Sequence, residues 1–366
     1  MGNMLTLKLS QWLDTTDPNV IRILRFTFGV TLSVAASFAF AWPLFFVTPI
    51  FVAKFLGSRE PCPNFLAGLA VTLVIGIGCG VGLAITYFTV HYPIVCLLTI
   101  SILLFHIFYA NVRGVSPLVV AFLLIGITAI PLMGTVSFGL ATSITGGLML
   151  SGGLAFIFVW IAHGFIPDRV SEVNKAAAPA AHPPMTDREQ IRSAAISTLV
   201  VLPVILIFFM FQMTNMLLVM IFIAMLAQTP DVKTGAKGSA ALVIGNTAGG
   251  IAAILFYNLL VAVPNFVFLI LLTVLFSLFF GERLFSGKPL TGLYATAFST
   301  VILLVGSTTG DMGGDAESKF YTRIAQIILA GAYIVGAFML LELLSRRKQK
   351  HEVYEQSRIV DDVDVT

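Results

Sequence analysis

The chain has 366 residues, of which 58% are hydrophobic and only 11% are charged. Soluble globular domains carry about 25% charged residues, so this composition excludes a protein whose main solvent is water. The net charge of +3, with Lys and Arg dispersed among apolar runs, also excludes a nucleic-acid-binding surface.

Apolar runs along the chain are candidates for membrane spans, on the rule that about 20 residues of helix cross about 30 Å of hydrocarbon. The second run of each half is short. The sequence therefore predicts an all-α polytopic membrane protein with about twelve transmembrane helices. The predicted spans are 22–41, 44–57, 64–88, 93–111, 116–133, 139–166, 193–211, 215–229, 239–260, 265–280, 290–307 and 320–344.

Three segments lie outside these spans. Residues 1–20 place a Trp and a Lys among leucines, which suits the membrane interface. Residues 167–190 form an Ala/Pro-rich linker, and residues 345–366 form a charged, solvated tail. The predicted domains are therefore a first six-span repeat over 21–166 and a second over 191–344, joined by the linker.

The second half repeats the first at an offset of 170 residues. Such duplicated bundles usually move a solute across a bilayer. The matching pairs are Ile21-Arg22 with Ile191-Arg192, Gly68 with Gly238, Gly80 with Gly250 and Arg113 with Arg283.

The short second spans decide the topology. If they cross, each half has six spans and the repeats are parallel; if they are re-entrant, each half has five and the repeats are inverted. Lys and Arg accumulate on the cytoplasmic side. Six spans per half place all but two of the 21 Lys and Arg residues there, the exceptions being Lys319 and Arg323. We therefore predict two parallel six-helix repeats with both termini in the cytoplasm.

Glycines recur four residues apart in the third span of each half, which gives a smooth helix face that a neighbouring backbone can approach closely. Such faces serve either static packing or sliding between access states, and the sequence leaves both open. The predicted helix-packing glycines are Gly76, Gly78, Gly80, Gly82, Gly245, Gly249 and Gly250.

Charged and titratable groups at membrane depth are the candidates for function. Arg323, near the outer end of the last span, is either a substrate or gating residue or a snorkelling Arg paired with the preceding loop. His106 is either a proton-coupling residue or hydrogen-bonded filler, and Asn111 follows it as a substrate-binding candidate. Arg113 and Arg283 either only orient the chain or form a basic rim that attracts anionic substrate at the cytoplasmic mouth.

Several chemistries have no motif in this sequence. It contains no GxxxxGK[ST], GxSxG or HExxH pattern and no metal-ligand spacing of His, Cys, Asp or Glu. The three cysteines form no CxxC pair and are interpreted as apolar filler. We therefore expect no enzyme, no cofactor and no metal site.

Several segments resemble the fusaric acid resistance family of aromatic acid exporters, in particular a compact inner-membrane branch. They are Arg25 with Gly29, the Trp42-Pro43 turn, the stretch from Thr229 to Gly250 and the stretch from Tyr321 to Ala332. The resemblance implies proton-gradient-driven export of small aromatic or amphipathic organic acids from the cytoplasm, beside a hemolysin-secretion-type periplasmic adaptor. Unlike many members of that family, this chain has only a short linker between its halves.

These observations predict an exporter in the bacterial inner membrane, with its pathway near the interface of the two repeats and with the short second spans and the glycine faces lining it. A homo-oligomer is also compatible with the sequence. The alternatives are a passive channel-like permease and a non-transporting membrane scaffold subunit. The scarcity of ionisable groups inside the predicted spans favours the two alternatives over an elaborate proton relay.

Overall fold

The computed structural model describes residues 17–58, 61–167, 186–211, 232–288 and 290–309, with isolated positions between 220 and 340. Its described residues form helices and no strands, and eight of the ten helices are long and apolar enough to cross a membrane. The other two, α3 and α6, are shorter and apolar. The helices are α2 (Pro18–Phe40), α3 (Val47–Gly57), α4 (Phe65–Thr89), α5 (Pro93–Val112), α6 (Pro117–Gly134), α7 (Phe138–Phe165), α9 (Asp187–Met210), α11 (Val232–Ala262), α12 (Phe266–Phe285) and α13 (Thr291–Thr309).

The helices correspond to ten of the predicted spans. The predicted spans 215–229 and 320–344 lie largely outside the described residues, as do most of the predicted N-terminal segment, the linker and the tail. The multi-pass helical class is therefore confirmed.

Several helix boundaries differ from the prediction, and two of the differences have local reasons. Helix α9 starts inside the predicted linker because Thr186 and Glu189 form a capping box, in which the Thr186 N–H donates to the Glu189 carboxylate at 3.0 Å. Helix α3 starts at Val47 rather than at residue 44 because the residues after α2 form a turn that contains Ala41 and Leu44 in left-handed conformations.

One end of the bundle gathers the starts of α2 and α4 with the ends of α3, α7 and α12. The Nη1 of Arg25 donates to the carbonyl of Ile166 at 3.4 Å, which joins the start of α2 to the end of α7. The indole N–H of Trp160, near the same end of α7, donates to the carbonyl of Pro63 at 2.8 Å, just before α4. Gly57 lies against Leu284, so α3 and α12 both end here. Helix α3 therefore runs back along α2.

Two pairs of helices pack in parallel through glycines. In the first half, Gly78 of α4 lies against Leu123 of α6, and Gly82 lies one turn further along against Gly126. In the second half, Gly249 of α11 lies against Ala297 of α13. Helix α13 also runs parallel to α2, because Phe298 packs on Phe26 and Gly306 lies against the residues that follow α2. Helices α4, α6, α11 and α13 thus all start at the end where α2 starts.

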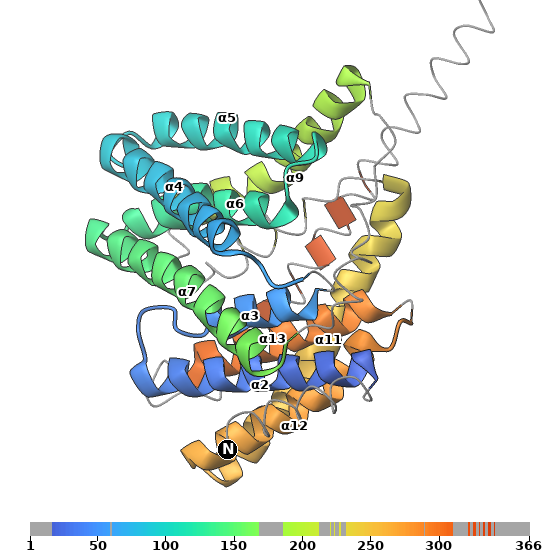
Figure 1. Ribbon diagram of the computed structural model, residues 1–366. Helices are drawn as coiled ribbons and strands as arrows, with labels where there is room; N and C mark the ends of the chain where they lie inside the picture. The colour runs from blue at the N-terminus through green and yellow to red at the C-terminus, as the bar shows by residue number, and fades with distance from the viewer. Residues whose placement is uncertain are drawn as a thin grey trace, which may run out of the picture.

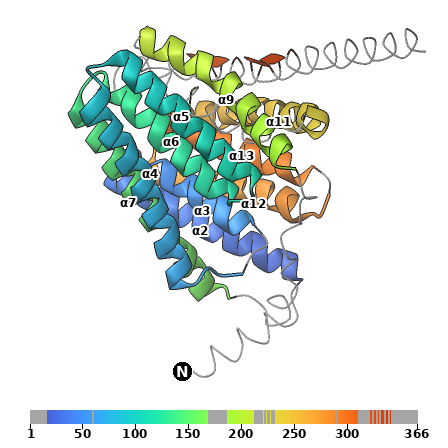
Figure 2. The same cartoon turned by 90° about the horizontal axis from the view of Figure 1, so that it is seen from above.

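Helices of the two halves pack against each other where the halves meet. Helix α12, from the second half, packs along α2, and helix α9 packs along α5 of the first half. Figures 1 and 2 show α9 beside α5 and α6, and α12 on the opposite side of the molecule beside α2. In each pair, the first helix of one half, α2 or α9, packs along a later helix of the other half.

Basic residues cluster at the end of the bundle where α2 starts, which we name the basic end. They lie at the starts of α2 and α11 and at the ends of α3, α5 and α12. This one-sided distribution is typical of a protein oriented in a membrane. The residues are Arg22, Arg25, Lys54, Arg113, Lys233, Lys237, Arg283 and Lys288.

Candidate functional site

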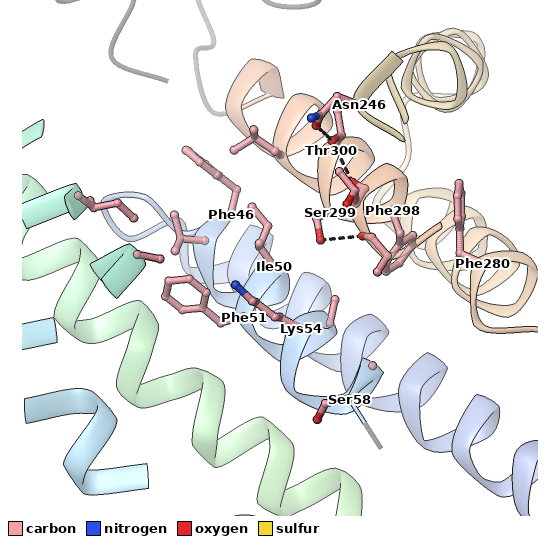
Figure 3. A pocket seen from close by; sticks show the side chains of 18 of the residues that line it. Phe46, Ile50, Phe51, Lys54, Ser58, Asn246, Phe280, Phe298, Ser299 and Thr300 are labelled. Carbon is pink, nitrogen blue, oxygen red and sulfur yellow. Dashed lines mark hydrogen bonds between the residues drawn. The ribbon is translucent and has the colours of Figure 1, made fainter. Parts of the chain in front are cut away.

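A cavity of about 530 Å³ lies between the two halves of the chain. Helices α2, α3, α6 and α7 line it from the first half, and α11, α12 and α13 line it from the second. Its size falls within the range of about 300 to 1,000 Å³ that is usual for small-molecule sites. Figure 3 shows α3 facing α13 across this space.

Helix α3 presents one stripe of side chains to the cavity. Val47, Ile50 and Lys54 recur three or four residues apart, the spacing that places them on one face of a helix, and Ser58 follows directly after the helix. The opposite face is buried in the first half, where Leu56 lies against Gly29 of α2. Because α3 is short and packed on α2 and α7, its stripe has a fixed direction into the cavity.

Aromatic rings form much of the wall. Phe298 of α13 packs on Phe26 and on Phe280, each with ring centroids 5.3 Å apart. Phe51 of α3 meets Phe122 of α6 edge to face at 4.8 Å. Aromatic pairs of this kind hold a rigid apolar surface against which a flat ligand ring can pack.

The wall opposite α3 carries a polar pair. The hydroxyl of Thr300 on α13 donates to the side-chain oxygen of Asn246 on α11 at 2.7 Å, and both residues are buried. Ser299, also on α13, donates its hydroxyl to the carbonyl of Ala295 at 3.0 Å. These groups place hydrogen-bonding atoms on an otherwise apolar surface (Figure 3).

Lys54 is the charged side chain among the described residues that line the cavity. Within the described part of the chain it forms no ion pair, and no Asp, Glu, Arg or His there lines the same space. Figure 3 shows its nitrogen directed from α3 toward the ring of Phe51. The side chain of Lys54 is exposed, so its ammonium is accessible from the cavity, where a bound anion can pair with it.

The chemistry of the cavity follows from these three features. Aromatic walls favour a flat apolar body, the ammonium favours a carboxylate or another anion, and the polar pair offers a further hydrogen-bond contact. Within the described residues, no cluster of three or more His, Cys, Asp or Glu side chains is placed to hold a metal ion.

Comparison with known proteins gives one match. A family model described as a protein of unknown function (DUF2955) matches residues 22–162. The match covers helices α2 to α7, which form the first half. No curated protein and no solved structure matches the chain. The family description makes no link to fusaric acid resistance or to aromatic acid export, so that resemblance stays a prediction.

The structure places the predicted titratable and polar candidates away from the cavity. His106 is exposed on α5, and its Nδ1 lies 2.8 Å from the carbonyl oxygen of Ile102 one turn earlier. Asn111 is half-buried at the end of the same helix. Neither residue lines the cavity. Arg323 lies outside the described residues.

Arg113 and Arg283 occupy equivalent places in the two halves. Each is exposed at the basic end, and each lies over an aromatic ring four residues earlier, Tyr109 at 5.5 Å and Phe279 at 5.7 Å. This cation–π geometry holds each guanidinium near the helix that carries it. The structure does not bring the two arginines into the cavity.

The predicted packing glycines also lie outside the cavity lining. Gly78 and Gly82 contact α6, whereas Gly245 and Gly249 contact α13. The other three differ among themselves, because Gly76 faces Met149 of α7, Gly80 has no neighbour within 4 Å of an added Cβ, and Gly250 is buried.

Sequence reasoning missed Lys54 as a site residue and treated it only as part of the cytoplasmic charge bias. The signal was present, since Lys54 interrupts an otherwise apolar run from Val47 to Gly57. A single charge inside so short a run is unusual at membrane depth. Asn246 and Thr300 gave no such signal, because their pairing joins two helices far apart in the sequence.

Proposed function

We propose that this protein is a bacterial inner-membrane exporter of small aromatic or amphipathic organic acids. The single observation that carries the proposal is the cavity between the halves, whose lining combines several phenylalanine rings with the ammonium of Lys54. An aromatic carboxylate matches both features, because its ring packs on the phenylalanine walls and its charge pairs with the ammonium.

The transport fold that we propose has twelve spans in two parallel six-helix repeats. The direction of the described helices supports this, since α4, α5 and α6 alternate in the same sense as α11, α12 and α13. The reversal of α3 along α2 supports six helices in the first half. In this arrangement the basic end faces the cytoplasm, and Lys54 lies near the cytoplasmic end of the cavity.

The remaining features of the proposal come from the resemblance stated above. They are coupling to the proton gradient and a hemolysin-secretion-type periplasmic adaptor as partner. The absence of enzymatic activity is proposed on other grounds, because the sequence has none of the catalytic motifs named above. A homo-oligomer belongs to the same proposal. Cells that lack the adaptor gene but carry this chain would then accumulate the acid as a strain without the exporter does.

Replacing Lys54 by Gln tests the substrate site. In a strain deleted for the gene, we expect K54Q to lower efflux of a labelled aromatic acid such as benzoate by about tenfold or more, because a buried anion loses its counter-charge. Membrane abundance should stay at the level of the parent, since Lys54 contacts no ion-pair partner in the described structure.

The matched control is K288Q, which removes a charge that is exposed at the basic end and does not line the cavity. Its efflux should equal that of the parent protein. Normal efflux by K54Q at normal abundance would reject the proposed site. A parent protein that moves none of a panel of aromatic acids would reject the substrate class.

A passive channel-like permease is the second candidate, and one observation favours it. The described cavity lining holds Lys54 but no His, Asp or Glu that would relay protons. Collapse of the proton gradient with an uncoupler separates the two functions. Concentrative efflux should stop if the gradient drives transport, whereas downhill flux through a passive permease should continue.

A further inference from the structure

The turn between α2 and α3, residues Ala41 to Phe46, has an unusual backbone. Ala41 and Leu44 have φ values of 47° and 57°, in the left-handed region that non-glycine residues rarely adopt. These are the two described non-glycine residues with positive φ. Such conformations persist only where the surrounding structure holds them in place. This turn has contacts of that kind with α7 and with α13.

On one side, hydrogen bonds fix the turn to α7. The indole N–H of Trp42 donates to the hydroxyl of Ser151 at 3.1 Å, and that hydroxyl donates to the carbonyl of Leu44 at 3.2 Å. The hydroxyl of Thr48, at the start of α3, donates to the carbonyl of Ser151 at 3.4 Å. The carbonyl of Pro43 lies directly against Gly147, where no side chain would fit.

On the other side, the turn meets the second half through an apolar contact. Phe46 lies against Gly306 of α13, and a Cβ added at Gly306 would overlap the Cβ of Phe46. No hydrogen bond joins the described side chains of the turn to α13. Among the described residues, the turn is therefore anchored to the first half by hydrogen bonds and meets α13 through the packing of Phe46 on Gly306.

The turn also forms part of the wall of the cavity. Leu44 and Phe46 line the cavity at the end away from Lys54. Phe40, Ala41 and Pro43 are exposed on the outer side of the same segment, and Phe40 has 78% of its surface accessible. The turn thus carries both cavity-lining and exposed residues, at the end of the bundle opposite the basic end.

From these contacts we propose that the turn Ala41–Phe46 is the outer gate of the cavity, hinged on α7 and closed on Gly306. This inference rests on the proposed transport function, because a gate presupposes a transported solute. When the halves move apart, the packing of Phe46 on Gly306 is lost, whereas the bonds of Trp42 and Leu44 to Ser151 carry the turn away with α7. The cavity then opens toward the periplasm.

Thiol labelling tests the gate without any substrate. In a variant with Cys62, Cys79 and Cys96 replaced by Ala, a cysteine is placed at Leu303, which lines the cavity one turn before Gly306. A membrane-impermeant maleimide is then added to spheroplasts from the outside. We expect slow labelling of L303C. Labelling should be several-fold faster in the G306A background, because the added methyl group displaces Phe46 from its contact with α13.

The matched control on the same helix is G292A, because Gly292 is exposed and has nothing within 4 Å of an added Cβ. It should leave labelling of L303C slow. F46A provides a second way to open the gate, since it removes the contact with α13 without crowding it. If G306A fails to reach the membrane, F46A alone decides the outcome.

Two results would overturn the gate. The first is labelling of L303C in the parent as fast as that of an exposed cysteine at Phe40. The second is no acceleration by F46A or G306A in protein that reaches the membrane. Neither result depends on aromatic acid efflux, so an exporter without this gate and a gated cavity with a different substrate give distinct outcomes.

Discussion

The two glycine seams, α4 against α6 and α11 against α13, use the same packing in the two halves but differ in what surrounds it. Gly82 meets Gly126 and Ile130 of α6, and Gly249 meets Ala297 and Thr300 of α13. In both seams the lack of a side chain at a glycine lets two parallel helices approach closely enough for their backbones to touch. This similarity is what the duplicated sequence leads one to expect.

The residues that follow the glycines differ in polarity. Cys79 follows Gly78 in the first seam and is buried, and Ile130 on the facing helix is fully buried. In the second seam Asn246 follows Gly245, and it bonds to Thr300 at the edge of the cavity. The helices of the first seam therefore meet through close apolar packing. The second seam also supplies hydrogen-bonding groups to the proposed binding site. The first half contributes to the same cavity through Lys54 and its phenylalanines, so both halves line the proposed site but only the second seam borders it with a polar pair.

The largest expected effect breaks the first seam. G82A places a methyl group against the backbone of Gly126, which cannot move aside as a side chain can. Overpacking of this kind costs about 1 to 3 kcal/mol, so we expect lower membrane abundance and a lower midpoint of thermal unfolding in detergent.

The control for this substitution lies half a turn away on the same helix. Gly80 is exposed and has no neighbour within 4 Å of an added Cβ. G80A should leave abundance unchanged or raise stability slightly, because Ala costs less entropy in a helix than Gly does. Equal stability of G82A and G80A would show that the first seam is not closely packed.

Much of the fold could be predicted because each span is one uninterrupted apolar run. The prediction 93–111 corresponds to α5 at Pro93–Val112, and 139–166 corresponds to α7 at Phe138–Phe165. The start of α3 could not be predicted, since the left-handed residues of the preceding turn are held by contacts with Ser151, more than a hundred residues away.

The faces of these helices are harder to predict than their ends. A helix that is apolar all round has no pattern that says which side faces the interior. Helix α5 is of this kind, so its sequence leaves open whether His106 couples protons from an interior position or only forms a hydrogen bond. The structure exposes His106 and turns Lys54 into the cavity. Both outcomes depend on which helices become neighbours, and that is set by the packing of α3 against α13 and of α5 against α9.

A smaller effect should come from the polar pair of the second seam. T300V removes the donor to Asn246 with little change in shape, and interhelical hydrogen bonds in membrane proteins contribute about 1 kcal/mol. We expect the midpoint of thermal unfolding to fall by a few degrees. Because N246A removes the other partner, the double variant N246A/T300V should be less destabilised than the sum of the single variants. Strict additivity would show that the pair contributes nothing to the second seam.

The smallest effect concerns the feature in which the halves agree most closely. Y109L and F279L remove the rings beneath Arg113 and Arg283, and an exposed cation–π contact contributes about 0.5 to 1 kcal/mol. Since the two contacts have nearly the same geometry, both variants should lower the midpoint of thermal unfolding by a similar small amount and leave efflux unchanged. A loss of efflux in one variant alone would assign that arginine a role at the cytoplasmic mouth that its counterpart lacks, and would extend the asymmetry of the seams to the ends of α5 and α12.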